Sequence, residues 1–270
     1  MVIHTVNSAD TPSGQSFIAE VNQILTLPAD GAGKRVAFDC EGVNLSRLGT
    51  VEIVSICFPS LDVYLVDFGC TLCPMVHKAV KDLFEDASVT KIIHDCRMDC
   101  DALYHLHRIQ VNNVHDTSCF HGVEDSNLND VLSYNGIMIN KSRDKTVYKR
   151  NPRFWAARPL TATMVDWASS DVQNLFALAD AQLNRITTIG LAKSAAIAKS
   201  SQYSRIVCNM KVCSGLTVRN PGFFIGPRGQ NIRSLQRRTG TMVYQDYQIG
   251  WMVFYDSESS LEAVKRSMSE

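Results

Sequence analysis

The sequence predicts an α/β domain over residues 1–202, followed by a smaller α+β domain over residues 203–270. In the first part, three strand-like runs precede alternating helical and strand-like runs, which is typical of a mixed sheet flanked by helices. In the second part, a strand, a helix-turn-helix, two strands and a helix follow one another. The stretch 192–204 is rich in Ala, Ser and Lys and is interpreted as the boundary.

The composition excludes several classes of protein. The chain has 270 residues, of which 45% are hydrophobic, and its 27 basic residues balance its 27 acidic ones, which argues against a uniformly basic nucleic-acid binder. No apolar run reaches the ~18 residues of a membrane span, and residues 1–13 lack the apolar core of a secretory signal. We therefore expect an intracellular protein without a membrane anchor, and its nine cysteines are interpreted as reduced thiols. Cys70 and Cys73 have the spacing of a metal or redox pair, but no second pair follows, so two loop cysteines are the simpler interpretation.

The first elements are assigned from the spacing of apolar residues. Residues 17–25 carry apolar side chains at helical spacing, and Ser13 or Ser16 is the expected cap of this helix. The next strand-like runs follow one another at close spacing, so we expect them to pair as antiparallel hairpins. These runs cover residues 35–39, 51–58 and 63–66.

Helices and strands then alternate along the rest of the first domain. The pattern predicts a helix at 76–84, a strand at 91–94, a helix at 98–107 and a short strand at 111–114. A further helix begins near residue 127 and ends at Gly136, a suitable C-terminal cap. After a loop, Thr161 can cap a long helix that runs to Leu183.

The second domain is shorter and begins with an expected strand at 206–212. A turn with glycines at both ends follows, and Ser257 is a candidate cap for the final helix. The remaining elements are a helix at 230–239, strands at 241–247 and 249–255, and a helix at 257–268.

Four carboxylates are candidate metal ligands. Asp39 and Glu41 are two residues apart at the end of a strand, so their side chains share one face. Asp99 follows the strand that ends at His94, and Asp171 lies on the long helix. Carboxylates suit Mg²⁺ or Mn²⁺, and four of them would hold two ions roughly 3.5–4 Å apart for phosphoryl transfer. In a chain with 27 acids such pairs also arise by chance, but an acidic pair ending a buried strand would otherwise be costly.

These acids carry a family resemblance. The chain resembles the DEDD superfamily of 3′→5′ exonucleases, and its RNase D branch in particular, in three stretches that occur in the expected order. They are residues 36–42 (VAFDCEG), 92–99 (IIHDCRMD), and 155–161 (WAARPLT) together with 167–171 (WASSD). Residues 41–45 and 94–97 are most similar to the exonuclease-domain proteins related to Egalitarian. The resemblance implies an RNase H-like fold and a metal site built from the four acids.

Trp167 departs from this family pattern. The RNase D branch has a tyrosine four residues before the last aspartate, and its phenol contacts the attacking water. The indole of Trp167 is a donor only and cannot accept a proton from water. Asp166 is a weak substitute as the group that accepts the proton of the attacking water, because helix geometry turns it about 100° away from Trp167. Trp167 remains a candidate catalytic residue, and the hypothesis is an active but slowed enzyme, or a domain that keeps only RNA binding.

Two basic stretches are candidate RNA-binding elements. Residues 141–158 hold seven basic side chains and one acidic one, and Trp155 among them is expected in the core. Lysine and arginine contacts to phosphate bind nucleic acid without regard to base sequence. The candidates in this stretch are Lys141, Arg143, Lys145, Lys149 and Arg150.

The second stretch lies in the C-terminal domain. Between two predicted helices, the turn Gly226, Pro227, Arg228 and Gly229 lets the backbone approach phosphates, and Arg233 follows it. This arrangement resembles a KH domain of the eukaryotic type (type I) over residues 203–270. KH domains clamp about four single-stranded nucleotides at such a loop.

These observations lead to one functional prediction and one alternative. We expect a 3′→5′ exoribonuclease that uses two Mg²⁺ or Mn²⁺ ions to trim or degrade single-stranded RNA, with the C-terminal domain holding the substrate. The alternative is a catalytically weak or inactive exonuclease-like RNA-binding adaptor. A nuclease acting on single-stranded DNA would share the same site, so that substrate stays open.

Overall fold

The computed structural model describes residues 2–29, 33–70, 73–121, 126–140, 143–144, 146–189, 193–246 and 248–270. The chain divides into two compact units, Met1–Lys145 with Arg153–Cys208, and Asn209–Glu270 with Thr146–Pro152. The division at 208 lies beyond the expected boundary at 202. Helix α8 (Lys193–Asn209) runs through the expected linker, because alanine and lysine are good helix formers.

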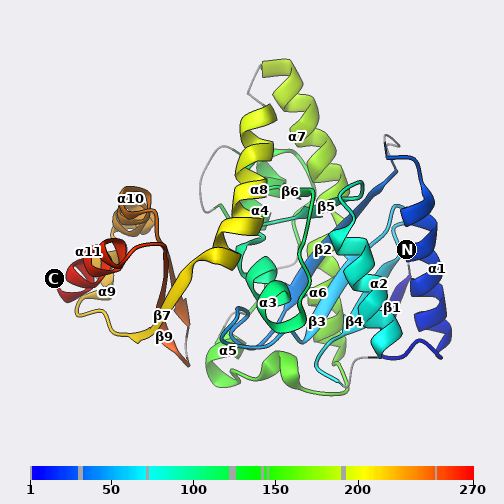
Figure 1. The fold of residues 1–270 in the computed structure, drawn as a ribbon, viewed down its shortest axis with the longest axis horizontal. Helices are drawn as coiled ribbons and strands as arrows, with labels where there is room; N and C mark the ends of the chain where they lie inside the picture. The colour runs from blue at the N-terminus through cyan, green and yellow to red at the C-terminus, as the bar shows by residue number, and fades with distance from the viewer. Residues whose placement is uncertain are drawn as a thin grey trace. The chain divides into compact units, whose positions relative to one another are not determined.

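The first unit is built on a six-stranded mixed sheet in the order β1-β4-β3-β2-β5-β6 (Figure 1). Strands β2, β3 and β4 pair antiparallel, as their close spacing in the sequence predicted. The other three neighbours pair in parallel, and β1 was not predicted from the sequence. The strands are β1 (Ile3–Val6), β2 (Arg35–Glu41), β3 (Ile53–Cys57), β4 (Val63–Asp67), β5 (Thr90–Ile93) and β6 (Val114–Asp116).

The predicted helices of this unit lie close to their expected ranges, with two differences. Thr11, rather than Ser13 or Ser16, caps α1: its Oγ1 accepts from the backbone N–H of Gly14 at 3.1 Å. The long helix that Thr161 caps ends at Gln173, and a new helix begins at Leu175. The helices are α1 (Pro12–Thr26), α2 (Pro74–Glu85), α3 (Arg97–His107), α4 (Leu128–Tyr134), the 3₁₀ turn η1 (Phe154–Ala156), α6 (Ala162–Gln173), α7 (Leu175–Ile189) and α8.

Strand β2 presents different side chains to the two faces of the sheet. Val36, Phe38 and Cys40 belong to the main hydrophobic core, together with side chains from α1, α2 and α3. Asp39 and Glu41 alternate with them and therefore point to the opposite face. Helix α6 lies against β2, β3 and β4. The alternation of β2 thus places Asp39 and Glu41 on the face of the sheet that α6 covers, away from this core.

The second unit is a three-stranded antiparallel sheet, in the order β7-β9-β8, with helices packed on it. The expected order of elements is found, but its first strand is displaced: α8 continues to Asn209 and β7 begins at Lys211. Ser257 caps the last helix by accepting from the N–H of Ser260 at 3.2 Å. The elements are α5 (Thr146–Arg150), β7 (Lys211–Leu216), α9 (Pro221–Ile225), η2 (Pro227–Gly229), α10 (Gln230–Thr239), β8 (Met242–Asp246), β9 (Gly250–Tyr255) and α11 (Glu258–Ser269).

A separate hydrophobic core supports this second unit. Phe224 of α9, Leu235 of α10 and Val264 of α11 pack with Trp251 and Val253 of β9. In the parts of the chain that the structure describes, no helix combines the length and apolarity that crossing a bilayer requires.

Candidate metal centre and its surroundings

Three of the four predicted acids meet at one place. Asp39 and Glu41 lie on β2, and Asp171 lies on α6, which packs against the same face of the sheet. One carboxylate oxygen from each of them lies within 4.8 Å of the other two. Each side chain is only partly buried, so an ion from solvent can reach the group. We refer to Asp39, Glu41 and Asp171 as the acid cluster.

Asp99, the fourth predicted acid, lies next to the acid cluster and outside it. Its Oδ1 accepts a hydrogen bond from the backbone N–H of Cys40 at 2.9 Å, and the residue is 6% exposed. Its negative charge is still close enough to raise the pKa of Asp39. The structure therefore shows Asp99 anchoring strand β2 between the two acids that the strand carries.

Burial makes these carboxylates reluctant to be charged. Removal from water raises the pKa of Asp39 well above its ordinary value, and the charges of Asp99, Asp171 and Glu41 add to this. Burial likewise raises the pKa of Glu41 to about 8, although Arg143 opposes it, and that of Asp99 to about 7. Such a group of acids is stable in its charged form only beside a cation.

Arg143 supplies a positive charge to the acid cluster. Its Nη1 donates to Oε1 of Glu41 at 3.0 Å, and its Nη2 forms an ion pair with Oδ2 of Asp171. The sequence predicted Arg143 as a phosphate-binding residue of the basic stretch, and this contact with the acids was not foreseen. The available signal was a stretch of seven basic residues that precedes the last predicted ligand in the sequence.

Trp167 lies one helical turn before Asp171. Its ring centroid is 5.5 Å from that of Phe154, and its backbone carbonyl accepts from Nη2 of Arg143 at 2.6 Å. Asp166 is exposed, as expected for a residue turned away from Trp167. Trp167 therefore contributes a carbonyl and a ring face beside the acid cluster.

Asn140 and Ser55, which the sequence did not point to, adjoin the acids. Asn140 donates from Nδ2 to Oδ1 of Asp171 at 3.1 Å, and Asn174 donates to Oδ1 of Asn140 at 3.2 Å. Ser55 lies directly opposite Asp39 across β3 and β2, so the two side chains share a face. The buried hydroxyl of Ser55 has no hydrogen-bond partner among the described residues. The atoms here that could coordinate a metal ion are oxygens, which fits a hard divalent cation.

Two further acids near this site, Asp95 and Asp101, are paired with arginines. Asp101 is fully buried and pairs with the guanidinium of Arg47 at 2.6 Å. Asp95 pairs with Arg97 at 2.5 Å. Among the described residues, Cys70 and Cys73 belong to no group of three metal-ligating side chains, and each is a free thiol.

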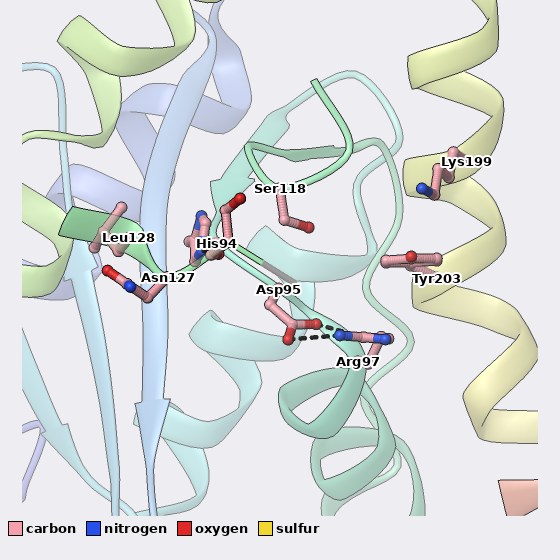
Figure 2. Close-up of a pocket in the computed structure, with 9 residues that line it drawn as sticks. His94, Asp95, Arg97, Ser118, Asn127, Leu128, Lys199 and Tyr203 are labelled. Atoms are coloured by element: carbon pink, nitrogen blue, oxygen red, sulfur yellow. Dashed lines mark hydrogen bonds and ion pairs between the residues drawn. The ribbon is translucent and has the colours of Figure 1, made fainter. Parts of the chain in front are cut away.

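A pocket of about 270 Å³ lies where β5 leads into α3 (Figure 2). His94 lines it, and its ring nitrogens lie 2.9 Å from Oγ1 of Thr117 and 2.8 Å from the carbonyl of Ser126. His94 thus packs at the end of its strand, with both ring nitrogens engaged. Tyr203 of α8 lines the opposite side, where the guanidinium of Arg97 lies 4.8 Å from its ring.

The basic stretch is only partly described. Lys141, Lys145 and the side chain of Lys149 lie outside the described residues. Arg150 lies on α5 and donates to Oγ1 of Thr146 at 2.6 Å. Trp155 is 3% exposed, so its predicted place in the core is confirmed.

The glycine turn of the second unit has the backbone that its sequence predicted. Gly226 and Gly229 have φ angles of 71° and 77°, a region that favours glycine, and the exposed Arg228 between them has 50°. A Cβ on Gly229 would lie 2.7 Å from Nη1 of Arg233. Pro227 is exposed as well, so the turn is open to solvent.

Comparisons with known proteins agree with this geometry. The model of a family described as 3′-5′ exonuclease matches residues 19–187, a range that holds all four predicted acids. The piRNA biogenesis protein EXD1 of Homo sapiens is 24% identical over 170 residues, which cover 55% of this chain and 33% of that protein. The Mus musculus protein of the same name is 26% identical over 143 residues, 46% of this chain and 25% of that protein. The chain thus spans a third or less of these relatives.

Solved structures share the fold of the first unit. NrnC of Brucella melitensis superposes with a TM-score of 0.56 at 22% identity, covering 76% of this chain and 93% of that one. RNase D of Escherichia coli gives a TM-score of 0.58 at 16% identity, covering 90% and 56%. RNase D of Trypanosoma brucei in complex with RNA U12 gives 0.56 at 20% identity, covering 76% and 71%. The predicted mixed sheet flanked by helices is confirmed, and the chain belongs to the 3′-5′ exonuclease family.

Proposed function

We propose that the protein is a divalent-metal-dependent 3′→5′ exonuclease that shortens single-stranded RNA. The observation that carries the proposal is the convergence of Asp39, Glu41 and Asp171 in a chain of this family. The structural neighbours support it, since NrnC of Brucella melitensis is also known with bound Mg²⁺ and RNase D of Trypanosoma brucei with RNA.

The chain's own residues have distinct roles in this proposal. Asp39, Glu41 and Asp171 would hold the metal, and Asp99, the fourth acid predicted as a ligand, would fix β2 through the N–H of Cys40. Two divalent ions at such a site supply an activated water and stabilise the leaving oxygen. Asn140 orients the carboxylate of Asp171. Trp167 offers no proton acceptor, so we expect a slow enzyme.

The second unit would hold the RNA. Its order of elements, β7-α9-η2-α10-β8-β9-α11, and its open glycine turn support the KH interpretation. Arg228 is exposed in that turn, and Phe223, just before it, is 58% exposed and available to stack on a base. Lys141, Lys145, Lys149 and Arg150 of the basic stretch remain proposed phosphate contacts.

The second candidate function is an RNA-binding adaptor with little or no catalysis. Trp167 in place of the usual tyrosine favours it, and so does the contact of Arg143 with two of the acids. The curated relatives are named as piRNA biogenesis proteins, and this chain covers a third or less of them.

One assay separates the two candidates. A 5′-labelled single-stranded RNA is incubated with the protein and Mg²⁺ or Mn²⁺, and the enzyme proposal expects a ladder of products shortened from the 3′ end. Asp39→Ala should abolish the ladder, and Trp167→Tyr should raise the rate severalfold. RNA binding without a ladder in the wild type, or a ladder that persists in Asp39→Ala, would contradict the enzyme proposal. The same assay with a single-stranded DNA of the same sequence tests the preference for the 2′-hydroxyl.

A further inference from the structure

Arg143 makes contacts that a bound divalent ion would also need. Its guanidinium bridges Glu41 and Asp171, two of the three carboxylates of the acid cluster. Only 17% of the Arg143 side chain is exposed, so this is a partly buried contact and not a loose surface pair. The same oxygens cannot pair closely with the guanidinium and coordinate a metal ion as well.

Trp167 holds Arg143 in this place. Its carbonyl accepts from Nη2 of Arg143 at 2.6 Å, and its ring centroid lies 5.5 Å from the guanidinium carbon. Tryptophan is the aromatic residue that attracts a cation most strongly. The residue that departs from the family pattern is thus the one that cradles the arginine.

We propose that Arg143 is an internal cation that competes with the divalent metal for the acid cluster, and that Trp167 stabilises the metal-free arrangement. The inference rests on the proposed metal-dependent function. The metal binds only molecules in which Arg143 has left the acid cluster. Its apparent affinity is therefore the intrinsic affinity multiplied by the fraction of such molecules. Arg143 therefore sets the metal concentration at which the site fills.

The experiment measures metal affinity and does not depend on activity. Mn²⁺ is titrated calorimetrically into the full chain, as wild type and as Arg143→Gln, Arg143→Lys, Arg153→Gln and Asp39→Asn. If the arginine has left in about a tenth of the molecules, Arg143→Gln raises the Mn²⁺ affinity roughly tenfold. Arg143→Lys keeps the charge but loses the planar fork of the guanidinium. Its Mn²⁺ affinity should therefore lie between those of the wild type and Arg143→Gln.

Arg153→Gln is the matched control. It removes the same charge from the same basic stretch at an exposed position, and the Mn²⁺ affinity should stay at the wild-type value. A second readout is thermal unfolding. Without metal, the melting temperature of Arg143→Gln should lie below that of the wild type. Saturating Mn²⁺ should raise the melting temperature of Arg143→Gln by more than it raises that of the wild type.

Two outcomes overturn the inference, and they are distinguishable. If Asp39→Asn abolishes Mn²⁺ binding but Arg143→Gln binds Mn²⁺ no more tightly than the wild type, the metal site stands and the competition is wrong. If Asp39→Asn binds Mn²⁺ as the wild type does, the metal site of the proposed function is wrong, and the competition falls with it. Arg143→Lys decides the question should Arg143→Gln fail to fold.

Discussion

Asn140 donates a hydrogen bond from its Nδ2 to Oδ1 of Asp171 at 3.1 Å, while Arg143 takes the other oxygen of the same carboxylate. The two oxygens of Asp171 are therefore held by different partners. A divalent ion would displace Arg143 and leave the bond from Asn140 in place. Asn140 is thus a positioning residue for a candidate ligand.

Asn140→Ala should weaken metal binding without unfolding the protein. A hydrogen bond to a charged group contributes about 1.5–3 kcal/mol, so we expect a loss of Mn²⁺ affinity of about tenfold or more. Calorimetric titration measures it. Asn135→Ala is the control, because Asn135 bonds the carbonyl of Val131 and not an acid of the cluster. Equal affinities of Asn140→Ala and wild type would show that Asp171 needs no such support.

The buried pair of Arg47 and Asp101 should dominate the local stability of α3. The side chain of Asp101 is 0% exposed, and that of Arg47 is 15% exposed. Removing the arginine leaves a buried charge without its ion pair, so Arg47→Ala should lower the free energy of unfolding by about 3 kcal/mol. Urea denaturation followed by circular dichroism measures this.

A solvent-exposed pair provides the comparison. Asp180, the partner of Arg35, has a side chain that is 50% exposed, so Arg35→Ala should cost about 1 kcal/mol or less. If Arg47→Ala and Arg35→Ala lost equal free energy of unfolding, burial would not be what makes the first pair more costly to break.

His115 should make the protein sensitive to mild acid. Burial lowers its pKa to about 4, whereas the unfolded chain protonates histidine near pH ~6.5. Between these values the unfolded state binds more protons, so the free energy of unfolding falls as pH falls from about 6.5 to 4. This one residue accounts for a loss of about 3 kcal/mol over that range.

Urea denaturation at several pH values tests this contribution. His115→Gln should show a smaller decrease in the free energy of unfolding over the same range. The His107 imidazole is also buried, and its pKa is likewise lowered to about 4, so part of the decrease should remain. A pH dependence identical to that of the wild type would rule out His115 as a source.

Arg228 should bind RNA through phosphate and not through bases. Arg228→Gln should lower the affinity for single-stranded RNA to a similar extent for unrelated sequences. It should also reduce the slope of log affinity against log salt by about 0.7, the value for one phosphate contact on a single strand. Fluorescence anisotropy at several salt concentrations measures both. Arg266→Gln, an exposed arginine on α11, should change neither; equal effects would indicate diffuse charge alone.

Much of the fold was predictable because local patterns specify it. The close spacing of the strand-like runs between residues 35 and 66 predicted the antiparallel strands β2, β3 and β4, and the alternation in β2 placed Asp39 and Glu41 on one face. The helix that occupies residues 193–209, where the sequence predicted a boundary, has a local cause as well. Alanine and lysine occur in linkers and also favour helices, so the composition of 192–204 did not distinguish the two.

The sequence by itself determined the pattern of acids, the two-part organisation and the glycine turn, because these depend on residue type and spacing along the chain. Tertiary structure decided which side chains meet. Asp99 bonds the backbone of Cys40 and stays outside the acid cluster, and Arg143 contacts Glu41 across a sequence separation of 102 residues. Such contacts depend on how α3 and the segment that holds Arg143 lie against β2, which spacing along the chain does not report.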